Sequence, residues 1–236
     1  MLFLLPVYEP GHGLVSTVVA LSEARPRAHV VVVDDGSGPA AAGLLDRARE
    51  LGCTVLRHET NRGKGAALKT GFRHIAAAHP GRPVVCADPD GQHHLADILQ
   101  VAEHVEVAGQ MVLGVRRFEG RVPLRSRFGN TVTRLLFRAA TGRDVRDTQT
   151  GLRGYPADLL GRLCGIPGER FEYEMNVLLD AARAGLPINE TVIATTYIGD
   201  NGTSHFGSLA DSARVYRPLL RYALSPRGAR SRPVTR

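Results

Sequence analysis

A short apolar run followed by two aspartates and a glycine indicates the fold class: Val84-Val85-Cys86-Ala87-Asp88-Pro89-Asp90-Gly91-Gln92-His93. Its four apolar residues predict a buried strand, and two carboxylates follow at the carboxyl end of that strand, where open α/β sheets place their ligands. Acidic side chains on alternate residues, with a glycine that lets the backbone approach closely, suit a divalent cation that also takes phosphate oxygens. Polar turns use the same residue types, so the surrounding sequence has to distinguish the two interpretations.

Short apolar runs alternate with amphipathic stretches through the first half of the chain. This pattern predicts an α/β fold with a Rossmann-like, mostly parallel central sheet and helices on both faces. We expect strands at Leu2–Tyr8, Val30–Asp34, Thr54–His58, Val84–Ala87 and Met111–Val115. Helices are expected at Leu14–Glu23, Ala40–Leu51, Ala66–His79 and Leu95–Ala108. The second half predicts helices at Ser126–Thr141 and Glu172–Ala184, a strand at Pro187–Thr196 and a loop at Gly199–Gly207.

The composition predicts one domain at residues 1–224, because 236 residues with 43% apolar content form a single large core. From Ser225 onward Pro, Gly, Ser and Arg dominate, which predicts a disordered basic tail at residues 225–236. No apolar run is long enough to span a bilayer, and the first residues lack the flank and cleavage site of a signal peptide, so we expect a cytoplasmic protein. Three widely spaced cysteines predict neither a disulfide framework nor a zinc site.

The net charge of +7 is concentrated in two segments. Residues 121–138 carry five arginines and no acid, and the last twelve residues carry four arginines and no acid. Localised basicity predicts a local anionic partner, such as a phosphate group or a lipid surface, and we expect no nucleic-acid partner.

Val33-Asp34-Asp35-Gly36-Ser37 repeats the arrangement of the opening stretch, with carboxylates at a strand end and a glycine turn. We favour a functional role for Asp35, whereas Asp34 is as consistent with capping the next helix. Asn61-Arg62-Gly63-Lys64-Gly65 precedes a helix but lacks the glycine spacing of a P-loop. The chain has no dinucleotide fingerprint either, which argues against a dehydrogenase.

Seven motifs in order resemble the family 2 glycosyltransferases, which have the GT-A fold, and within them the polyprenyl-phosphate transferases of the dolichyl-phosphate mannose synthase group. The resemblance runs from Leu2 to about Tyr222. Its motifs are Leu5-Pro6-Val7-Tyr8, Val33-Asp34-Asp35-Gly36-Ser37, Asn61-Arg62-Gly63-Lys64-Gly65, Asp88-Pro89-Asp90-Gly91-Gln92-His93, Gly114-Val115-Arg116, Ser126-Arg127-Phe128-Gly129-Asn130 and Asp147-Thr148-Gln149-Thr150-Gly151-Leu152-Arg153.

The resemblance implies an inverting, metal-dependent transfer of a sugar from a GDP- or UDP-sugar to a polyprenyl phosphate. It implies catalytic roles for Asp90, Arg116 and Arg127, with Arg116 and Arg127 facing the phosphates. The implied nucleotide-sugar-binding residues are Pro6, Tyr8, Val33, Asp35 and Asp88. Mg²⁺ or Mn²⁺ would be held by Asp88, Asp90 and Gln92. The chain departs from the family pattern where Glu9 and Pro10 replace Asn-Glu and where Gly199 and His205 replace an Arg and a Lys, which leaves His205 as a candidate ligand of the acceptor phosphate.

The acceptor stays open at this point. A polyprenyl phosphate is already an anion and needs no general base, whereas a hydroxyl acceptor on a saccharide or small molecule needs one, for which Asp147, Glu172 and Glu174 are candidates. Each of these acids has a structural alternative. A third alternative is a nucleotide-sugar-binding protein without activity.

Two segments favour attachment to a membrane surface. Helix Ser126–Ala140 is expected to carry Arg127, Thr131, Arg134 and Arg138 on one face and Phe128, Val132, Leu135 and Ala139 on another. Packing of that apolar face on the core is the alternative. With the basic residues near the carboxyl terminus, each contributing about 1 kcal/mol at an anionic leaflet, the segments predict reversible, peripheral attachment to the inner face of the membrane. A separate membrane protein partner is compatible with this arrangement.

Overall fold

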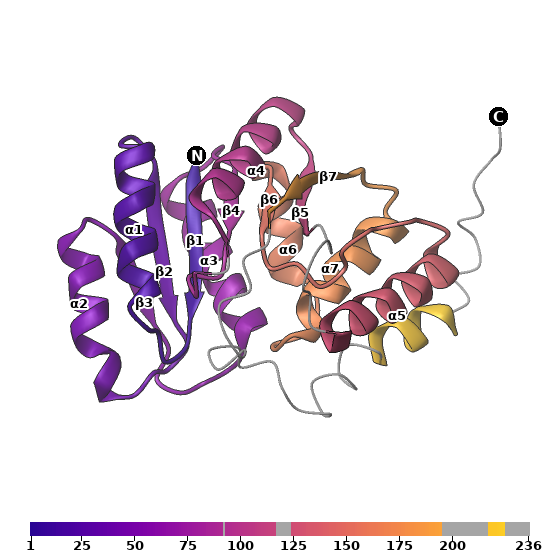
Figure 1. Ribbon diagram of the computed structural model, residues 1–236, viewed down its shortest axis with the longest axis horizontal. Helices are drawn as coiled ribbons and strands as arrows, with labels where there is room; N and C mark the ends of the chain where they lie inside the picture. The colour runs from indigo at the N-terminus through magenta and orange to yellow at the C-terminus, as the bar shows by residue number, and fades with distance from the viewer. Residues whose placement is uncertain (92, 117–123, 195–216, 225–236) are drawn as a thin grey trace.

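The computed structural model describes residues 1–91, 93–116, 124–194 and 217–224, with residues 124–128 described by their backbone. One seven-stranded sheet forms its centre, in the order β3-β2-β1-β4-β6-β5-β7 (Figure 1). All neighbouring strands pair in parallel except β6, which is antiparallel to β4 and β5. The strands are β1 (Leu2–Val7), β2 (His29–Asp34), β3 (Thr54–Arg57), β4 (Val84–Cys86), β5 (Met111–Arg116), β6 (Arg153–Tyr155) and β7 (Ile188–Ile193).

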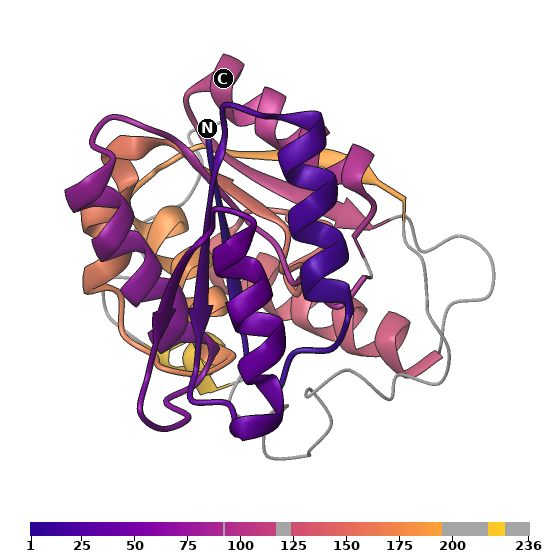
Figure 2. The ribbon, with the colours of Figure 1, turned by 90° about the vertical axis from the view of Figure 1, so that its left-hand side faces the viewer.

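Helices cover both faces of the sheet, because successive side chains of each strand point to opposite sides. In Figure 2, helices form a layer on each side of the central sheet. The α-helices are α1 (Gly13–Ala24), α2 (Ala42–Glu50), α3 (Lys64–Ala78), α4 (Leu95–Ala108), α5 (Leu124–Thr141), α6 (Leu160–Gly165) and α7 (Glu172–Arg183), and the short 3₁₀ helices are η1 (Pro39–Ala41) and η2 (Ala157–Leu159).

Two hydrophobic cores result from this arrangement. On one face, Leu2 and Leu4 of β1 belong to a cluster with α3, α6, α7 and Phe137 of α5. On the other face, Phe3 and Leu5 belong to a cluster with α1, α2 and α4. Because all of β1 and nearly all of β2 are buried, these strands are apolar without interruption, as strands covered on both faces require.

The expected strands and helices of the first half are confirmed to within a few residues at their ends. Neither β6 nor α6 was expected from the sequence pattern. β6 reads Arg-Gly-Tyr and has no apolar run, yet all three residues are buried. A Cβ at Gly154 would lie 3.0 Å from Val105 Cβ, so this glycine lets α4 pack directly on the strand. The expected loop at Gly199–Gly207 and the expected tail at 225–236 lie outside the described residues.

Candidate active site

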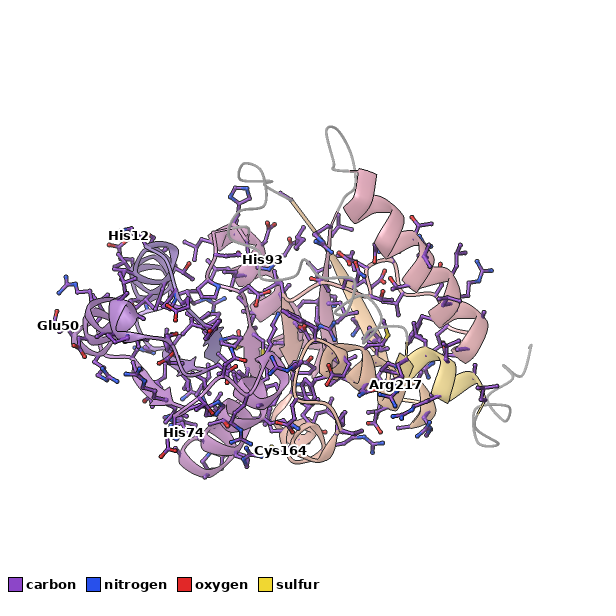
Figure 3. The ribbon with its side chains drawn as sticks, turned by 90° about the horizontal axis from the view of Figure 1, so that it is seen from below. His12, Glu50, His74, His93, Cys164 and Arg217 are labelled. Atoms are coloured by element: carbon purple, nitrogen blue, oxygen red, sulfur yellow. The ribbon has the colours of Figure 1, made fainter. Side chains whose placement is uncertain are left out.

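Those predicted site residues that the structure describes lie at or just past the carboxyl ends of β1, β2, β4 and β5. The chain runs downward through β1 and β2 in Figure 1, so Figure 3 looks onto this edge from below. In that view the labelled His93, which follows β4, lies between the start of α1, marked by His12, and α5. The start of antiparallel β6 adds a further segment, because Arg153 pairs with Cys86 of β4 and Leu113 of β5.

One group of residues at this edge lies at the carboxyl ends of β1 and β2. Pro6 and Val33 are register partners on these strands and are buried, and Tyr8 lies just past β1 with 39% of its surface exposed. Glu9 occupies the left-handed region at φ 48°. Its backbone nitrogen donates to Ser37 Oγ at 2.8 Å, and its carboxylate accepts from the Gly38 nitrogen at 2.8 Å. Glu9 therefore ties the loop after β1 to the loop after β2, a role that its departure from the family pattern did not indicate.

The two carboxylates after β2 have different surroundings. Asp34 Oδ1 accepts from the Ser37 nitrogen at 3.1 Å, and its Oδ2 lies 3.1 Å from Arg57 Nε, so Asp34 closes the turn before η1. Asp35 is 2% exposed and turns toward the β3–α3 loop. Its Oδ1 accepts from the Arg62 nitrogen at 3.0 Å and its Oδ2 from the Gly63 nitrogen at 2.6 Å. Asp34 does not cap the next helix, because η1 begins after Gly38 and α2 after Ala41, neither with a side-chain cap; it orders the turn at Ser37 instead. Asp35 holds the loop that leads into α3.

A partly buried charge cluster surrounds Asp88. Lys64 Nζ, at the start of α3, lies 2.8 Å from Asp88 Oδ1 and 2.9 Å from Oδ2. The same ammonium lies 3.3 Å from Glu174 Oε2 on α7. Burial alone would favour the neutral forms, but the opposite charges outweigh it, so the pKa of Asp88 is lowered and the pKa of Lys64 is raised. A Cβ at Gly151 would lie 2.2 Å from Asp88 Oδ2, so glycine is needed there for the motif to close over the cluster.

The donor set after β4 fits a divalent cation that takes part of its coordination from a ligand. Asp88 and Asp90 would supply carboxylate oxygens, and Gln92, whose position lies outside the described residues, would supply an amide oxygen. Among the residues that the structure describes, no group of three His, Cys, Asp or Glu side chains forms a complete metal cage. Such a loop suits Mg²⁺ or Mn²⁺, because these ions complete their shell with water and phosphate oxygens.

The loop of Asp88–Gly91 packs directly on the start of α1. A Cβ at Gly13 would lie 2.7 Å from the Pro89 carbonyl oxygen and 3.5 Å from the Gly91 nitrogen. Gly91 itself has φ 83°, a conformation that glycine adopts without strain. The Asp88–Gly91 loop is therefore held in place from the α1 side by backbone contact.

Arg116 is bound to a second buried carboxylate. Its Nε lies 2.6 Å from Asp147 Oδ2, and its Nη2 lies 3.0 Å from Asp147 Oδ1. The side chain of Asp147 is 1% exposed and that of Arg116 is 20% exposed. Asp147 Oδ1 also accepts from the Gln149 nitrogen at 3.1 Å, which fixes the turn that precedes β6. The Arg127 side chain and all of His205 lie outside the described residues.

A scan against protein-family models matches residues 3–162 to glycosyl transferase family 2. The chain belongs to this family. It is a glycosyltransferase of the GT-A fold, and the recognition of its motifs is confirmed. The sequence is 32% identical over 175 residues to an uncharacterized protein of Methanocaldococcus jannaschii, with 72% of this chain and 70% of the relative covered. It is 29% identical over 202 residues to the undecaprenyl-phosphate mannosyltransferase of Micrococcus luteus, with 82% of each covered.

Solved structures show the same fold. Glucosyl-3-phosphoglycerate synthase from Mycobacterium tuberculosis, in complex with Mn²⁺, UDP and glucosyl-3-phosphoglycerate, has a TM-score of 0.72 at 21% identity, over 94% of this chain and 79% of that chain. A mannosyltransferase from Pyrobaculum calidifontis, in complex with GDP-Man and Mn²⁺, has a TM-score of 0.58 at 19% identity, over 97% and 72%. At these identities the likeness concerns the fold.

The sequence pattern missed one structural centre of this glycosyltransferase, Arg153. Its side chain is 1% exposed and donates to the carbonyl oxygens of Thr150, Glu174 and Thr148 at 2.8, 2.8 and 3.3 Å. It holds the turn after Asp147 against the start of α7. A charged residue inside a three-residue strand gives no periodic signal, although its place at the end of the last quoted motif marked the segment.

The three acids considered as general bases in this glycosyltransferase all have protein partners. Asp147 binds Arg116, and Glu174 lies 3.3 Å from Lys64 Nζ and 3.8 Å from Arg153 Nε. Glu172 Oε1 accepts from the nitrogens of Glu169 and Arg170 at 3.1 and 3.2 Å, as acids at a helix amino end do. These contacts give each acid a structural role within the protein.

Of the described residues on the expected apolar face of α5, Leu135 and Ala139 are exposed and Val132 is half-buried, so they do not form the buried side of the helix. Among the described side chains of α5, those of Asn130, Thr133, Phe137 and Thr141 are buried, whereas Leu135 is 59% exposed and Leu136 is 37% exposed. Residues 217–223 form a further helical segment, drawn in yellow beside α5 in Figures 1 and 3. Leu220 and Leu224 of this segment are 57% and 84% exposed. None of the helices in the described part of the glycosyltransferase has the length and apolarity to cross a bilayer.

Proposed function

We propose that this glycosyltransferase moves a sugar from a nucleotide-sugar to a polyprenyl phosphate at a membrane surface, with inversion at the anomeric carbon. The M. luteus relative and a polyprenol monophosphomannose synthase of Mycolicibacterium smegmatis, 25% identical over 211 residues, are named for lipid-phosphate acceptors. The observation that carries the choice of acceptor is the engagement of Asp147, Glu172 and Glu174 by protein groups. A phosphate oxygen attacks without a general base, whereas a hydroxyl acceptor would need one of these acids to be available.

The donor would lie along the carboxyl ends of β1, β2 and β4. Pro6, Tyr8, Val33 and Asp35 would line the nucleoside end, because they lie beyond or at the ends of β1 and β2. The diphosphate would lie toward Asp90. This order would follow the strands across the sheet, with the sugar near the start of β6.

Asp90, with Asp88 and Gln92, would hold Mg²⁺ or Mn²⁺ on the diphosphate. A cation there supplies Lewis-acid stabilisation of the negative charge that develops on the departing diphosphate. Lys64 holds the Asp88 carboxylate from the other side and fixes its orientation. Arg116, oriented by Asp147, and Arg127 would face the phosphates of the donor or acceptor, with His205 as a further ligand of the acceptor phosphate.

In the reaction, an oxygen of the acceptor phosphate forms a bond to the anomeric carbon of the sugar while the bond from that carbon to the diphosphate oxygen breaks. The electron pair of the broken bond stays on the nucleoside diphosphate. Preorganised charges near the leaving group lower the barrier because they stabilise the transition state more than the ground state.

The exposed leucines of α5 and residues 217–224 suit peripheral attachment to the inner face of an anionic membrane. Arg138, Arg217 and Arg221 are exposed on the same two helical segments. Apolar side chains that enter the interface beside arginines that meet lipid headgroups are the features of an interfacial helix. This attachment would bring the polyprenyl phosphate to the site and is compatible with a separate membrane protein partner.

Incubation with radiolabelled UDP- and GDP-sugars, Mn²⁺ and a short polyprenyl phosphate tests the proposal. We expect an acid-labile, lipid-linked product that is lost in Asp90→Asn and kept in Asp46→Asn, an exposed aspartate on α2. Transfer to a saccharide hydroxyl but never to the lipid phosphate would overturn the acceptor assignment. Donor binding without transfer to any acceptor would instead support a binding protein.

A further inference from the structure

A chain of hydrogen bonds behind the nucleotide pocket begins at Asp35. His58 Nδ1 lies 2.7 Å from Asp35 Oδ1, and His58 Nε2 lies 2.9 Å from Thr70 Oγ1 on α3. The His58 side chain is 7% exposed and that of Asp35 is 3% exposed. A histidine directly after β3 gave no motif signal, so its role is visible only from these contacts.

The chemistry of the partners fixes the direction of these bonds. An ionised carboxylate only accepts, so His58 Nδ1 carries the proton and donates to Asp35. The Thr70 hydroxyl can donate to the remaining ring nitrogen, and it accepts a longer contact from Arg73 Nη2 at 3.4 Å. The donors therefore point in one direction, from the surface of α3 toward the Asp35 carboxylate.

The carboxylate cannot rotate freely within this arrangement. Oδ1 accepts from His58 and from the Arg62 nitrogen, while Oδ2 accepts from the Gly63 nitrogen. Gly63 has φ 105°, and a Cβ there would lie 2.5 Å from the Glu169 carbonyl oxygen, so the loop packs closely on the segment before α7. His58 supplies the side-chain contact that sets the plane of the carboxylate.

We propose that His58 is a positioning residue for the nucleoside half of the donor and acts through Asp35. This inference rests on the proposed function, in which Asp35 lines the nucleotide pocket. His58 does not touch the substrate. It presents the Asp35 carboxylate in one orientation.

Binding of UDP, GDP and pyrophosphate in the presence of Mn²⁺, measured by calorimetry, tests the inference in two variants. His58→Leu removes the donor to Asp35, whereas His58→Asn can place an amide N–H near the position of Nδ1. We expect His58→Leu to lower the affinity for the preferred nucleoside diphosphate by roughly tenfold, the effect of one charge-assisted hydrogen bond. The affinity for pyrophosphate should not change. His58→Asn should restore most of the affinity, and the donor KM should rise in His58→Leu with little change in kcat.

His29→Leu is the matched control. His29 lies at the start of β2, at the opposite end of the strand from Asp35, and its Nε2 lies 2.8 Å from Thr54 Oγ1. Its loss should leave nucleotide affinity unchanged. Unaltered nucleotide binding in His58→Leu, or an equal loss for pyrophosphate, would overturn the positioning role. If the unmodified protein binds neither nucleotide with Mn²⁺, the proposed function fails, and this inference fails with it.

Discussion

Replacement of Asp147 by asparagine should destabilise the protein far more than the same change at Asp144. Both aspartates bind an arginine through two nitrogens at similar distances: 2.6 and 3.0 Å for Arg116–Asp147, and 2.7 and 2.6 Å for Arg134–Asp144. Their burial differs. The Asp147 side chain is 1% exposed, whereas both partners of the Asp144 pair are about two-fifths exposed, at 39% and 41%.

The magnitude follows from this difference in burial. Loss of one partner of a fully buried pair costs about 3–5 kcal/mol, but Arg116 keeps some solvent contact, so we expect a loss of about 2–3 kcal/mol for Asp147→Asn. For a chain of this size that corresponds to roughly 4–12 °C in Tm. Asp144→Asn should cost below about 1 kcal/mol, since solvent already screens the pair.

Urea and thermal denaturation, followed by circular dichroism, measure both variants against the unmodified protein. The larger loss of stability expected for Asp147→Asn depends on the burial of its side chain. Equal losses in the two variants, or unfolding of Asp147→Asn at the same urea concentration as the unmodified protein, would contradict this prediction. Added salt provides an independent check, because it should weaken the Asp144 contribution more than the Asp147 contribution.

Three further predictions concern other parts of the molecule. The pKa of His29 is lowered by burial and by nearby cationic groups, so the unfolded chain binds the proton more readily than the folded protein. Stability should therefore fall as the pH drops below about 6.5. Thermal melts from pH 5 to 8 should show a weaker pH dependence in His29→Gln. Gly71→Ala should destabilise by about 1–3 kcal/mol because its Cβ would lie 2.3 Å from a leucine of β1, whereas Gly161→Ala meets nothing within 4 Å and should be neutral or stabilising in the same denaturation assay. Leu220→Glu should reduce co-sedimentation with anionic vesicles at low salt, while Val107→Glu, at an 89% exposed position of α4, should not; equal binding by both variants would argue against the proposed membrane surface.

The sequence predicted most of the sheet because its strands are apolar runs that end in charged or turn-forming residues. Val30–Asp34 and the run before Asp88 carry this signal in the order of residues alone. β6 carries none, since its Arg-Gly-Tyr sequence is buried through long-range contacts: Arg153 donates to three carbonyl oxygens, and Gly154 admits α4. A strand that is stabilised by tertiary contacts has no local sequence pattern that predicts it.

Asp35, Asp88 and Asp90 lie just after buried strands, as the sequence pattern predicted, whereas their contact partners were not predictable. Nothing local to Asp88 indicates that Lys64, 24 positions earlier, lies within 3 Å of it. The helical periodicity of α5 was correct, yet its apolar stripe faces outward, because Asn130 and Thr133 make the inner contacts through hydrogen bonds to residues 146 and 148. Periodicity identifies a face of a helix, and only tertiary contacts decide what that face meets.

Charge balance in the described part of the site supports a donor that binds together with a metal ion. Lys64 is paired with Asp88 and Glu174, and Arg116 is paired with Asp147. Among the described residues, Lys64 and Arg116 are therefore already compensated by carboxylates. A diphosphate that enters such a partly buried site brings further negative charge beside these carboxylates, where uncompensated charge is costly. A divalent cation on Asp90 would offset that charge locally, so the internal pairing that orders the site also accounts for its proposed dependence on Mg²⁺ or Mn²⁺.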